Sequence, residues 1–348
     1  MFRALCLAAV LAVLGGCGGS GDRARYISGA GATFPASLYA KWSEGYRGET
    51  KIGLNYQAIG SGGGIKQIKA RTVDFGATDK PLTAEQLDRA GLYQFPTVIG
   101  GVVPILNVDG ITPGQLKLTG PLLAAIFLGD VKSWNDPRIA SLNPGAKLPA
   151  QAITVVHRSD GSGTTFLFTS YLSGISPAWK QRVGASDAVS WPTGLAGKGN
   201  DGVAAFVKQT AGSIGYVEYA YAKQNNGAYA QLQNRAGQFV VPSAESFGAA
   251  AASADWAKAP GNYLVLVDQP GGGSWPITGA SFILVYREQT NAQVGRGVLR
   301  FFDWGFAKGD QAAAQLDYVP LPATVKDMIR KQWAATLKAE GKPLYPLQ

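Results

Sequence analysis

The sequence predicts an α/β protein made of two lobes, and three observations carry this prediction. Short apolar runs rich in β-branched residues alternate with amphipathic stretches along the chain, a pattern typical of strands and helices packed in layers. Two of the apolar runs, at 95–107 and 276–286, are long and lack helical spacing. The chain has 348 residues, which favours two lobes over a single hydrophobic core.

Each expected element follows from its local residue pattern. Apolar runs with strand character predict strands at 52–59, 95–107, 153–157, 213–218 and 276–286. Apolar residues at helical spacing, with Pro, Gly or Asn-Asp-Gly at the start, predict helices at 35–46, 65–70, 164–172, 203–208, 294–308 and 324–340.

The two long strands are expected to cross between the lobes. On this prediction one lobe combines residues 26–103 with 276–348, and residues 104–275 form the other. A two-lobed α/β protein binds its ligand in the crevice between the lobes, at the carboxyl ends of the strands. We therefore seek the site in the loops that follow the strands.

The N-terminal 17 residues predict export. Arg3 precedes an apolar run of eleven residues, 4–14, which suits a signal peptide and is too short for a membrane span. Leu14-Gly-Gly-Cys17 resembles a bacterial lipobox, so we expect cleavage at residue 17, lipidation of Cys17 and a Gly-rich tether at 18–25. An ordinary signal peptide with a coincidental cysteine is the alternative. Both interpretations predict a periplasmic protein. The lipobox interpretation also predicts that a lipid anchors the protein to a bacterial membrane.

Composition excludes several function classes. The formal net charge is +9, but Lys and Arg are scattered, which disfavours nucleic-acid binding and still favours encounter with small anions. The densest basic stretch, 326–342, has helical spacing and is expected to be a solvated helix face. His157 is the one histidine and Cys6 and Cys17 are the two cysteines, so no His/Cys metal cluster is expected. We expect no cofactor.

Three glycine-rich segments share one chemistry, since each precedes an expected helix. They are 28–35, 60–64 and 160–164, which contribute Thr33, Phe34, Ser61, Ser162, Gly163 and Thr164. The first N–H groups of a helix have no intrahelical partner and lie at the positive end of its dipole, which suits an anion. Ordinary helix capping explains any one segment, whereas three together favour an anion site. The known phosphate motifs GxxxxGK[ST] and GxGxxG are absent.

The stretch 157–166 supports two interpretations. It could be a catalytic cluster with Ser162 or Thr164 as nucleophile and His157 as base, or a cradle that only holds an anion. Neighbours on a strand point to opposite faces, so if Arg158 faces the crevice, His157 faces away. Asp160, two residues after Arg158, can pair with it and hold its guanidinium. The anion cradle is therefore the favoured interpretation of 157–166. For the pair of Arg158 and Asp160, the alternative is an ordinary surface salt bridge.

Asp79 follows a short segment with strand character, 73–79. It is either a turn residue or cap, or a carboxylate facing the anion. The second interpretation makes chemical sense if the ligand carries a proton that Asp79 can accept. Phosphate keeps a proton at neutral pH and sulfate does not, and a site built around such a bond rejects the analogue that lacks it.

These segments, with 197–202, closely resemble the periplasmic phosphate-binding proteins of Pst-type ABC importers. The resemblance covers residues 28–345 and implies a type II periplasmic-binding fold, with two α/β lobes, two crossing strands and a ligand cleft between them. It implies phosphate contacts from Thr33, Phe34, Ser61, Asp79, Arg158, Ser162, Gly163 and Thr164, with Asp160 orienting Arg158. Gly62, Thr78 and His157 depart from the family pattern.

The resemblance implies a non-catalytic phosphate receptor, monomeric, that delivers its ligand to a permease and ATPase. A serine-dependent phosphatase is the alternative from another class, opposed by the position expected for His157. A same-fold binder of sulfate or molybdate, or a phosphate scavenger without a transporter, is the third. Asp79 argues against a sulfate ligand, and nothing in the sequence separates the scavenger from the receptor.

Overall fold

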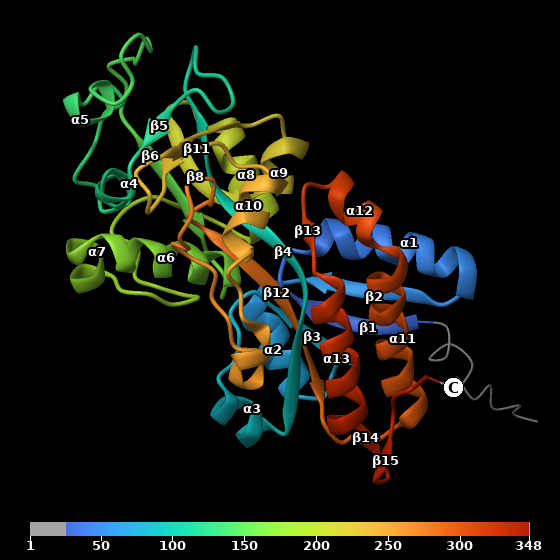
Figure 1. Ribbon diagram of the computed structural model, residues 1–348. Helices are drawn as coiled ribbons and strands as arrows, with labels where there is room; N and C mark the ends of the chain where they lie inside the picture. Colours follow the sequence, from blue (N-terminus) through green and yellow to red (C-terminus); the bar gives the residue numbers. More distant parts are fainter. Residues whose placement is uncertain (1–25, 348) are drawn as a thin grey trace, which may run out of the picture.

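The computed structural model describes residues 26–347. The expected signal peptide 1–17, the lipidation of Cys17 and the tether 18–25 lie outside the described residues. Within these bounds the α/β class and the two-lobed architecture are confirmed: Figure 1 shows two bodies joined by strands that run between them.

The first lobe is built on parallel strands that are covered by helices on both faces. It contains β1 (Tyr26–Gly31), α1 (Ala36–Thr50), β2 (Gly53–Ala58), α2 (Ser61–Lys69), β3 (Phe75–Thr78), α3 (Ala84–Ala90), α11 (Ala292–Lys308), α12 (Asp310–Gln315), β13 (Val319–Pro320), α13 (Ala323–Thr336), β14 (Lys338–Ala339) and β15 (Lys342–Pro343).

The second lobe has its own parallel strands and a longer set of short elements. It contains β5 (Lys117–Leu118), α4 (Gly120–Phe127), α5 (Pro137–Ala140), β6 (Thr154–Arg158), α6 (Gly163–Ile175), α7 (Pro177–Arg182), β7 (Leu195–Gly197), α8 (Gly199–Gln209), β8 (Ser213–Glu218), α9 (Tyr219–Gln224), β9 (Ala228–Tyr229), β10 (Gln231–Gln233), β11 (Phe239–Val240) and α10 (Ala244–Ala251). Two 3₁₀ turns, η1 (Trp256–Lys258) and η2 (Pro260–Asn262), follow α10 in the chain, and η2 packs against α3 of the first lobe and against the strand at residues 92–107.

Two antiparallel strands, β4 (Leu92–Asn107) and β12 (Thr278–Tyr286), join the lobes. The main sheet has the order β2-β1-β3-β12-β4-β8-β6-β7. β4 changes partner along its length, pairing with β12 as far as Gly101 and with β8 from Val102 onward. Its side chains are buried at every position except Asn107, which explains why the sequence shows a continuous apolar run there.

Hydrophobic cores on both faces fix the sheet of the first lobe. On one face the rings of Tyr39 and Phe75 lie edge-on to Phe302 of α11, with centroids 5.8 and 5.1 Å away. On the other face Ile68 of α2 packs in a cluster with Ala30 and Leu284. Helices on both faces hold the strand ends, and therefore the loops that follow them, in place.

Several element boundaries differ from the sequence expectation. α2 begins at Ser61 and α8 at Gly199, four residues earlier than expected in each case, so the glycines belong to the first turns. The last helix, α13, ends at Thr336 rather than 340. Lys326 does not lie on a solvated face, because it is buried and its Nζ donates to the carboxylate of Asp310.

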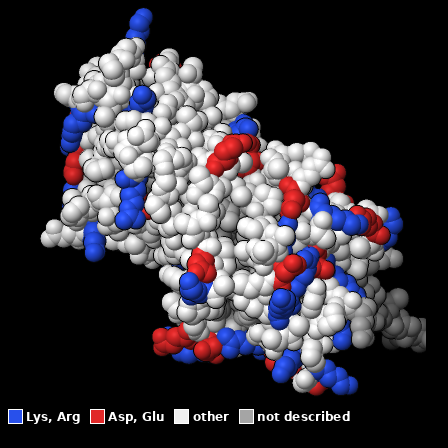
Figure 2. Space-filling model, in the orientation of Figure 1, with Lys and Arg blue, Asp and Glu red and all other residues white. Residues whose placement is uncertain are grey.

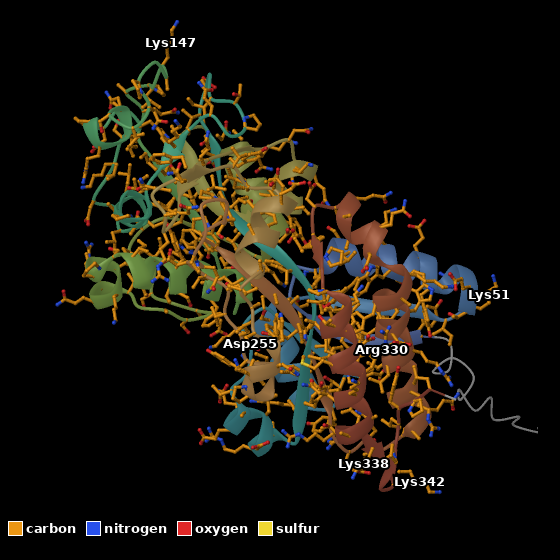
Figure 3. The ribbon with its side chains drawn as sticks, viewed as in Figure 1. Lys51, Lys147, Asp255, Arg330, Lys338 and Lys342 are labelled. Atoms are coloured by element: carbon orange, nitrogen blue, oxygen red, sulfur yellow. The ribbon has the colours of Figure 1, made fainter. Side chains whose placement is uncertain are left out.

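Charged side chains are dispersed over the surface. Figure 2 shows basic and acidic groups mixed over the face in view. Among the labelled residues of Figure 3, Lys51, Lys147 and Lys342 lie at separate outer ends of the molecule. Arg330 is paired with Asp303 and Asp327. This dispersion matches the scattered Lys and Arg of the sequence. No helix within residues 26–347 is long and apolar enough to cross a membrane.

Candidate functional site

The expected site residues meet where the two lobes touch. Thr33 and Phe34 lie between β1 and α1, Ser61 begins α2, and Asp79 follows β3. From the second lobe, Arg158 ends β6 and is followed by the start of α6. The ligand-contact residues expected from the sequence are all buried, a set comprising Thr33, Phe34, Ser61, Asp79, Arg158, Ser162, Gly163 and Thr164.

Arg158 and Asp160 form a two-pronged ion pair. Arg158 Nε donates to Asp160 Oδ1 over 2.8 Å and Nη2 donates to Oδ2 over 2.6 Å. Asp160 Oδ1 also accepts the N–H of Gly199 at the start of α8. The geometry fixes the guanidinium plane. Its remaining nitrogen, Nη1, is buried and has no hydrogen-bond partner among the described residues, so the ion pair leaves one cationic donor unused.

Asp79 is the carboxylate of the site, with 1% of its surface exposed. Its Oδ1 accepts the hydroxyl of Ser281 on β12 over 2.8 Å. Burial raises the pKa of Asp79 to about 7, although the hydrogen bonds and charge of Ser281, Arg158 and Ser61 favour its ionised form. A carboxylate with this pKa can hold or accept a proton near neutral pH.

The hydroxyls of the site are oriented by backbone donors. Ser61 Oγ accepts the N–H of Asp79 over 3.2 Å and that of Gly163 over 3.0 Å, which joins the two lobes. Ser162 caps α6, and its Oγ accepts the N–H of Thr165. A hydroxyl has one proton and two lone pairs. Because Ser61 already accepts two hydrogen bonds, its proton is left to be donated within the site.

Asn200 is a site residue that sequence reasoning left without a role. It lies in the first turn of α8, fully buried, where its Nδ2 donates to Thr33 Oγ1 over 2.7 Å and to Thr164 Oγ1 over 3.3 Å. Its Oδ1 accepts the N–H of Glu218 over 3.1 Å. Asn200 thus links a hydroxyl of each lobe. The sequence predicts Asn200 only as part of the start of a helix, and its role becomes apparent from the contacts that its buried side chain makes.

Three further residues of the site were not predicted from the sequence, and two of them, Tyr221 and Tyr318, have no local signal. Tyr221 donates to the carbonyl of Thr33 over 2.7 Å, and Tyr318 lies 2.6 Å from the carbonyl of Phe34. Ser281, the partner of Asp79, is a polar residue within an apolar strand, and that contrast was available in the sequence.

Among the described residues, the hydrogen bonds of His157 do not include one to Ser162. Its ring stacks on Trp191 with centroids 4.7 Å apart, and its Nδ1 lies 3.1 Å from the carbonyl oxygen of Arg158. Burial lowers the pKa of His157. The expectation that His157 faces away from the Arg158 side of the strand agrees with this packing, which removes His157 as the base that the catalytic interpretation of 157–166 assigned to Ser162.

The lobes are in close contact around the site. Gly62 N donates to the carbonyl of Gly161 over 2.8 Å, and a Cβ on Gly163 would lie only 2.5 Å from that of Asp79. At the rim, Lys80 Nζ pairs with Asp187 over 2.6 Å. Gly62, one of the positions that depart from the pattern of the resembled family, therefore lies in the contact between lobes. The structure has the lobes closed on each other.

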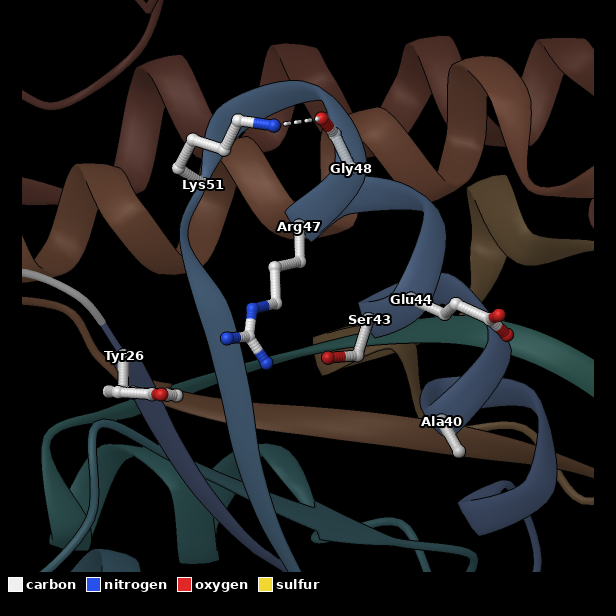
Figure 4. A pocket seen from close by; sticks show the side chains of 7 residues that line it. All are labelled: Tyr26, Ala40, Ser43, Glu44, Arg47, Gly48 and Lys51. Carbon is white, nitrogen blue, oxygen red and sulfur yellow. Dashed lines mark hydrogen bonds between the residues drawn. The ribbon is translucent and has the colours of Figure 1, made fainter.

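Two other features of the molecule do not form a site with these residues. A surface hollow of about 770 Å³ lies beside α1 and is shown in Figure 4; Ser43, Arg47 and Lys51 are among the residues that line it. Lys51 Nζ donates to the backbone carbonyl of Gly48. The hollow holds none of the expected site residues. Within residues 26–347, no group of three or more His, Cys, Asp or Glu is placed to hold a metal ion.

Comparisons with known proteins identify the family of the chain. The PBP superfamily domain matches residues 18–307. The phosphate-binding protein PstS of Pasteurella multocida is 56% identical over 93% of this chain and 94% of its own length, and that of Methanocaldococcus jannaschii is 35% identical over 92% and 91%. Among solved structures, a phosphate-binding protein from Stenotrophomonas maltophilia has a TM-score of 0.67 at 22% identity, covering 91% of this chain and 97% of that one, which shows a shared fold. The chain belongs to the PstS family of phosphate-binding proteins, within the PBP superfamily.

Proposed function

We propose that this protein binds inorganic phosphate outside the cytoplasmic membrane and delivers it to an ABC importer. The observation that carries the proposal is the combination of Asp79 and Arg158 in one buried site. Arg158 offers an unpartnered guanidinium nitrogen to an anion, and Asp79 offers a carboxylate that can accept a proton from it. An anion that carries a proton matches both groups, and phosphate is such an anion at neutral pH. The names of the relatives support the same ligand.

The phosphate oxygens are assigned to donors from both lobes. We infer that Arg158 Nη1, the backbone at Thr33 and Phe34, the hydroxyl of Ser61 and the start of α6 at Ser162, Gly163 and Thr164 donate to the phosphate, and that Asp79 accepts its proton. Asp160 fixes Arg158 without touching the ligand. Helix starts and fixed donors suit a dianion because they need no reorganisation on binding.

The site is proposed to bind without catalysing a reaction. A serine nucleophile needs a base within hydrogen-bond reach, whereas His157 is stacked on Trp191 and Ser162 Oγ accepts a backbone N–H of its own helix. Release of the ligand then requires the lobes to open, which is the step an importer would use.

Location and organisation complete the proposal. We infer cleavage of residues 1–17, lipidation of Cys17 and attachment to a bacterial membrane through the tether 18–25, with the monomer as the working unit and a permease and an ATPase as partners. We place the lobe boundaries at 103/104 and 275/276, although residues 260–262 pack against α3 and β4. A Cys17→Ser variant is expected to appear in the soluble periplasmic fraction, whereas an ordinary signal peptide would leave the distribution unchanged.

Native mass spectrometry of the purified protein tests the ligand directly. We expect an added mass of one phosphate that is removed by an enzymatic phosphate scavenger and restored by added phosphate. A protein that carries sulfate, or binds neither ion, would contradict the proposal.

A further inference from the structure

Glu218, at the end of β8, is a buried carboxyl that the binding site described above does not use. It is fully buried. Its Oε2 accepts the N–H of Ala220 over 3.1 Å and lies 2.8 Å from the hydroxyl oxygen of Tyr318. Its Oε1 is also buried and has no hydrogen-bond partner among the described residues. Burying this group as an ionised carboxylate without a cationic partner would cost folding free energy.

The hydroxyl of Tyr318 has two close neighbours that both need a proton. It lies 2.6 Å from the carbonyl oxygen of Phe34 and 2.8 Å from Glu218 Oε2. A carbonyl oxygen can only accept, and a tyrosine hydroxyl carries one proton. If Tyr318 donates to Phe34, the short contact with Glu218 needs a proton from the carboxyl. If Tyr318 donates to Glu218 instead, two oxygens with no proton between them lie 2.6 Å apart at Phe34.

We propose that Glu218 works as a neutral carboxylic acid, whose proton on Oε2 is donated to Tyr318 so that Tyr318 can donate to the carbonyl of Phe34 and position the Thr33–Phe34 loop. Glu218 is therefore a positioning residue. The inference rests on the proposed function in one respect, that this loop holds the phosphate. It assigns a role to two residues, Glu218 and Tyr318, that are 100 positions apart.

The surroundings of Glu218 favour the neutral form. Burial raises the pKa of Glu218 well above its usual range, and the negative charges of Asp79 and Asp317 raise it further. Asp317 is itself paired with Lys223 of α9 over 2.8 Å. Arg158, the cation of the site, lies on the adjacent strand β6, and its charge is neutralised in part by Asp160.

A neutral Glu218 suits an anion site because it adds no negative charge near the ligand. An ionised carboxylate at this point would add a negative charge to a region that already contains Asp79 and a bound phosphate. It would also draw the proton of Tyr318 away from Phe34. Since Glu218 N donates to Asn200 Oδ1, the same residue is joined to both halves of the proposed cradle, through Tyr318 on one side and Asn200 on the other.

Infrared difference spectroscopy tests the proton assignment. At neutral pH exposed carboxyls are ionised, so a carbonyl band of a protonated acid reports buried groups. Because Asp79, with a pKa of about 7, is also partly protonated near neutral pH, the band has two components. We expect the Glu218 component in the wild type, its loss in Glu218→Gln, and its persistence in Asp79→Asn and in the control Glu245→Gln, whose carboxyl is exposed. A spectrum of Glu218→Gln identical to that of the wild type would overturn the assignment.

Tyr318→Phe tests the positioning role and stays informative if Glu218→Gln does not fold. The variant removes the acceptor of the Glu218 proton, so we expect the carbonyl band to shift and phosphate to bind about tenfold more weakly. Tyr263→Phe, a change on an exposed tyrosine, should alter neither. An unshifted band together with wild-type affinity would refute the role.

Recording the spectra with and without phosphate separates this inference from the proposed function. A protein that shows the Glu218 band but binds no phosphate would contradict the phosphate receptor and keep the proton assignment. A protein that binds phosphate and lacks the Glu218 band would contradict the proton assignment and keep the phosphate receptor.

Discussion

The hydroxyl of Ser281 donates to Asp79 Oδ1 over 2.8 Å, although the two residues are 202 positions apart. Ser281 lies on the crossing strand β12 and Asp79 at the end of β3, which pair in the sheet. One oxygen of the carboxylate is thereby held by the protein, which leaves the other for a ligand. The bond fixes the orientation of the group on which the choice of ligand is proposed to depend.

Replacing Ser281 by Ala should weaken phosphate binding. The variant removes a donor from the ionised carboxylate, so the pKa of Asp79 rises further and fewer molecules carry the charge that accepts the ligand proton. Hydrogen bonds to charged groups contribute about 1.5–3 kcal/mol, which corresponds to an affinity loss of roughly tenfold to a hundredfold. Isothermal titration calorimetry with phosphate measures this loss of affinity. Ser141→Ala, at an exposed position, is the control, and equal affinities for both variants would contradict the role of Ser281.

The raised pKa of Asp79 predicts a pH-dependent stability of the ligand-free protein. The folded state binds the proton of Asp79 more tightly than the unfolded state does. The ionised carboxylate therefore lowers the free energy of unfolding: the loss is absent below the usual pKa of 3.8 and grows until about pH 7. The shift corresponds to a penalty on the order of 4 kcal/mol at most, from about 1.36 kcal/mol per pKa unit. Asp79→Asn should therefore raise the melting temperature at pH 8 and leave it nearly unchanged near pH 3.5. A variant less stable than the wild type at pH 8 would count against the pKa.

Gly163→Ala should prevent the lobes from closing. A Cβ at this position would lie 2.5 Å from the Cβ of Asp79 and 2.7 Å from its backbone nitrogen, so the contact cannot form without displacement. Overpacking of this kind costs about 1–3 kcal/mol or more, which predicts binding weakened by about fivefold or more. Small-angle scattering should show no compaction on adding phosphate.

The matched control is Gly174→Ala in the same helix. A Cβ there meets nothing within 4 Å, so binding should be unchanged and the helix slightly stabilised. Two variants that bind equally well would show that the close contact between Gly163 and Asp79 does not belong to the bound state.

Asn200→Ala should speed the release of phosphate. The variant removes the donor shared by Thr33 and Thr164 and leaves the buried N–H of Glu218 without its acceptor. An unsatisfied buried group costs about 1–3 kcal/mol, so we expect a dissociation rate about tenfold higher in stopped-flow measurements. Gln224→Ala removes an exposed bond between the lobes, to Ser37, and should change the rate by less than about twofold. Equal rates would exclude Asn200 as a link between lobes.

Local patterns predicted the parts of the site that are close in sequence. Asp160 lies two residues after Arg158, which placed both on one side of the chain, and strand alternation separated His157 from them. The crossing strand β4 was visible as an apolar run because it is buried almost throughout. The fold class followed from the same alternation of elements.

Contacts across the fold could not be predicted in this way. Tyr318 meets Phe34 across 284 residues, and no local pattern encodes that distance. The glycines before α2 suggested a loop, whereas the structure uses them for close packing inside the helix. A Cβ on Gly64 would lie 2.5 Å from the Cα of Gly31, so the residue type reflects how closely α2 approaches β1.

Competition between phosphate and sulfate in wild type and Asp79→Asn tests the central claim most directly. The wild type should bind phosphate with little effect of excess sulfate at pH 8, because a fully deprotonated anion faces the charge of Asp79. Asp79→Asn should bind phosphate more weakly and admit sulfate, reducing the selectivity by at least about a hundredfold, whereas Asp109→Asn, at an exposed turn, should match the wild type. Unchanged selectivity in Asp79→Asn, or sulfate bound as tightly as phosphate by the wild type, would contradict the account.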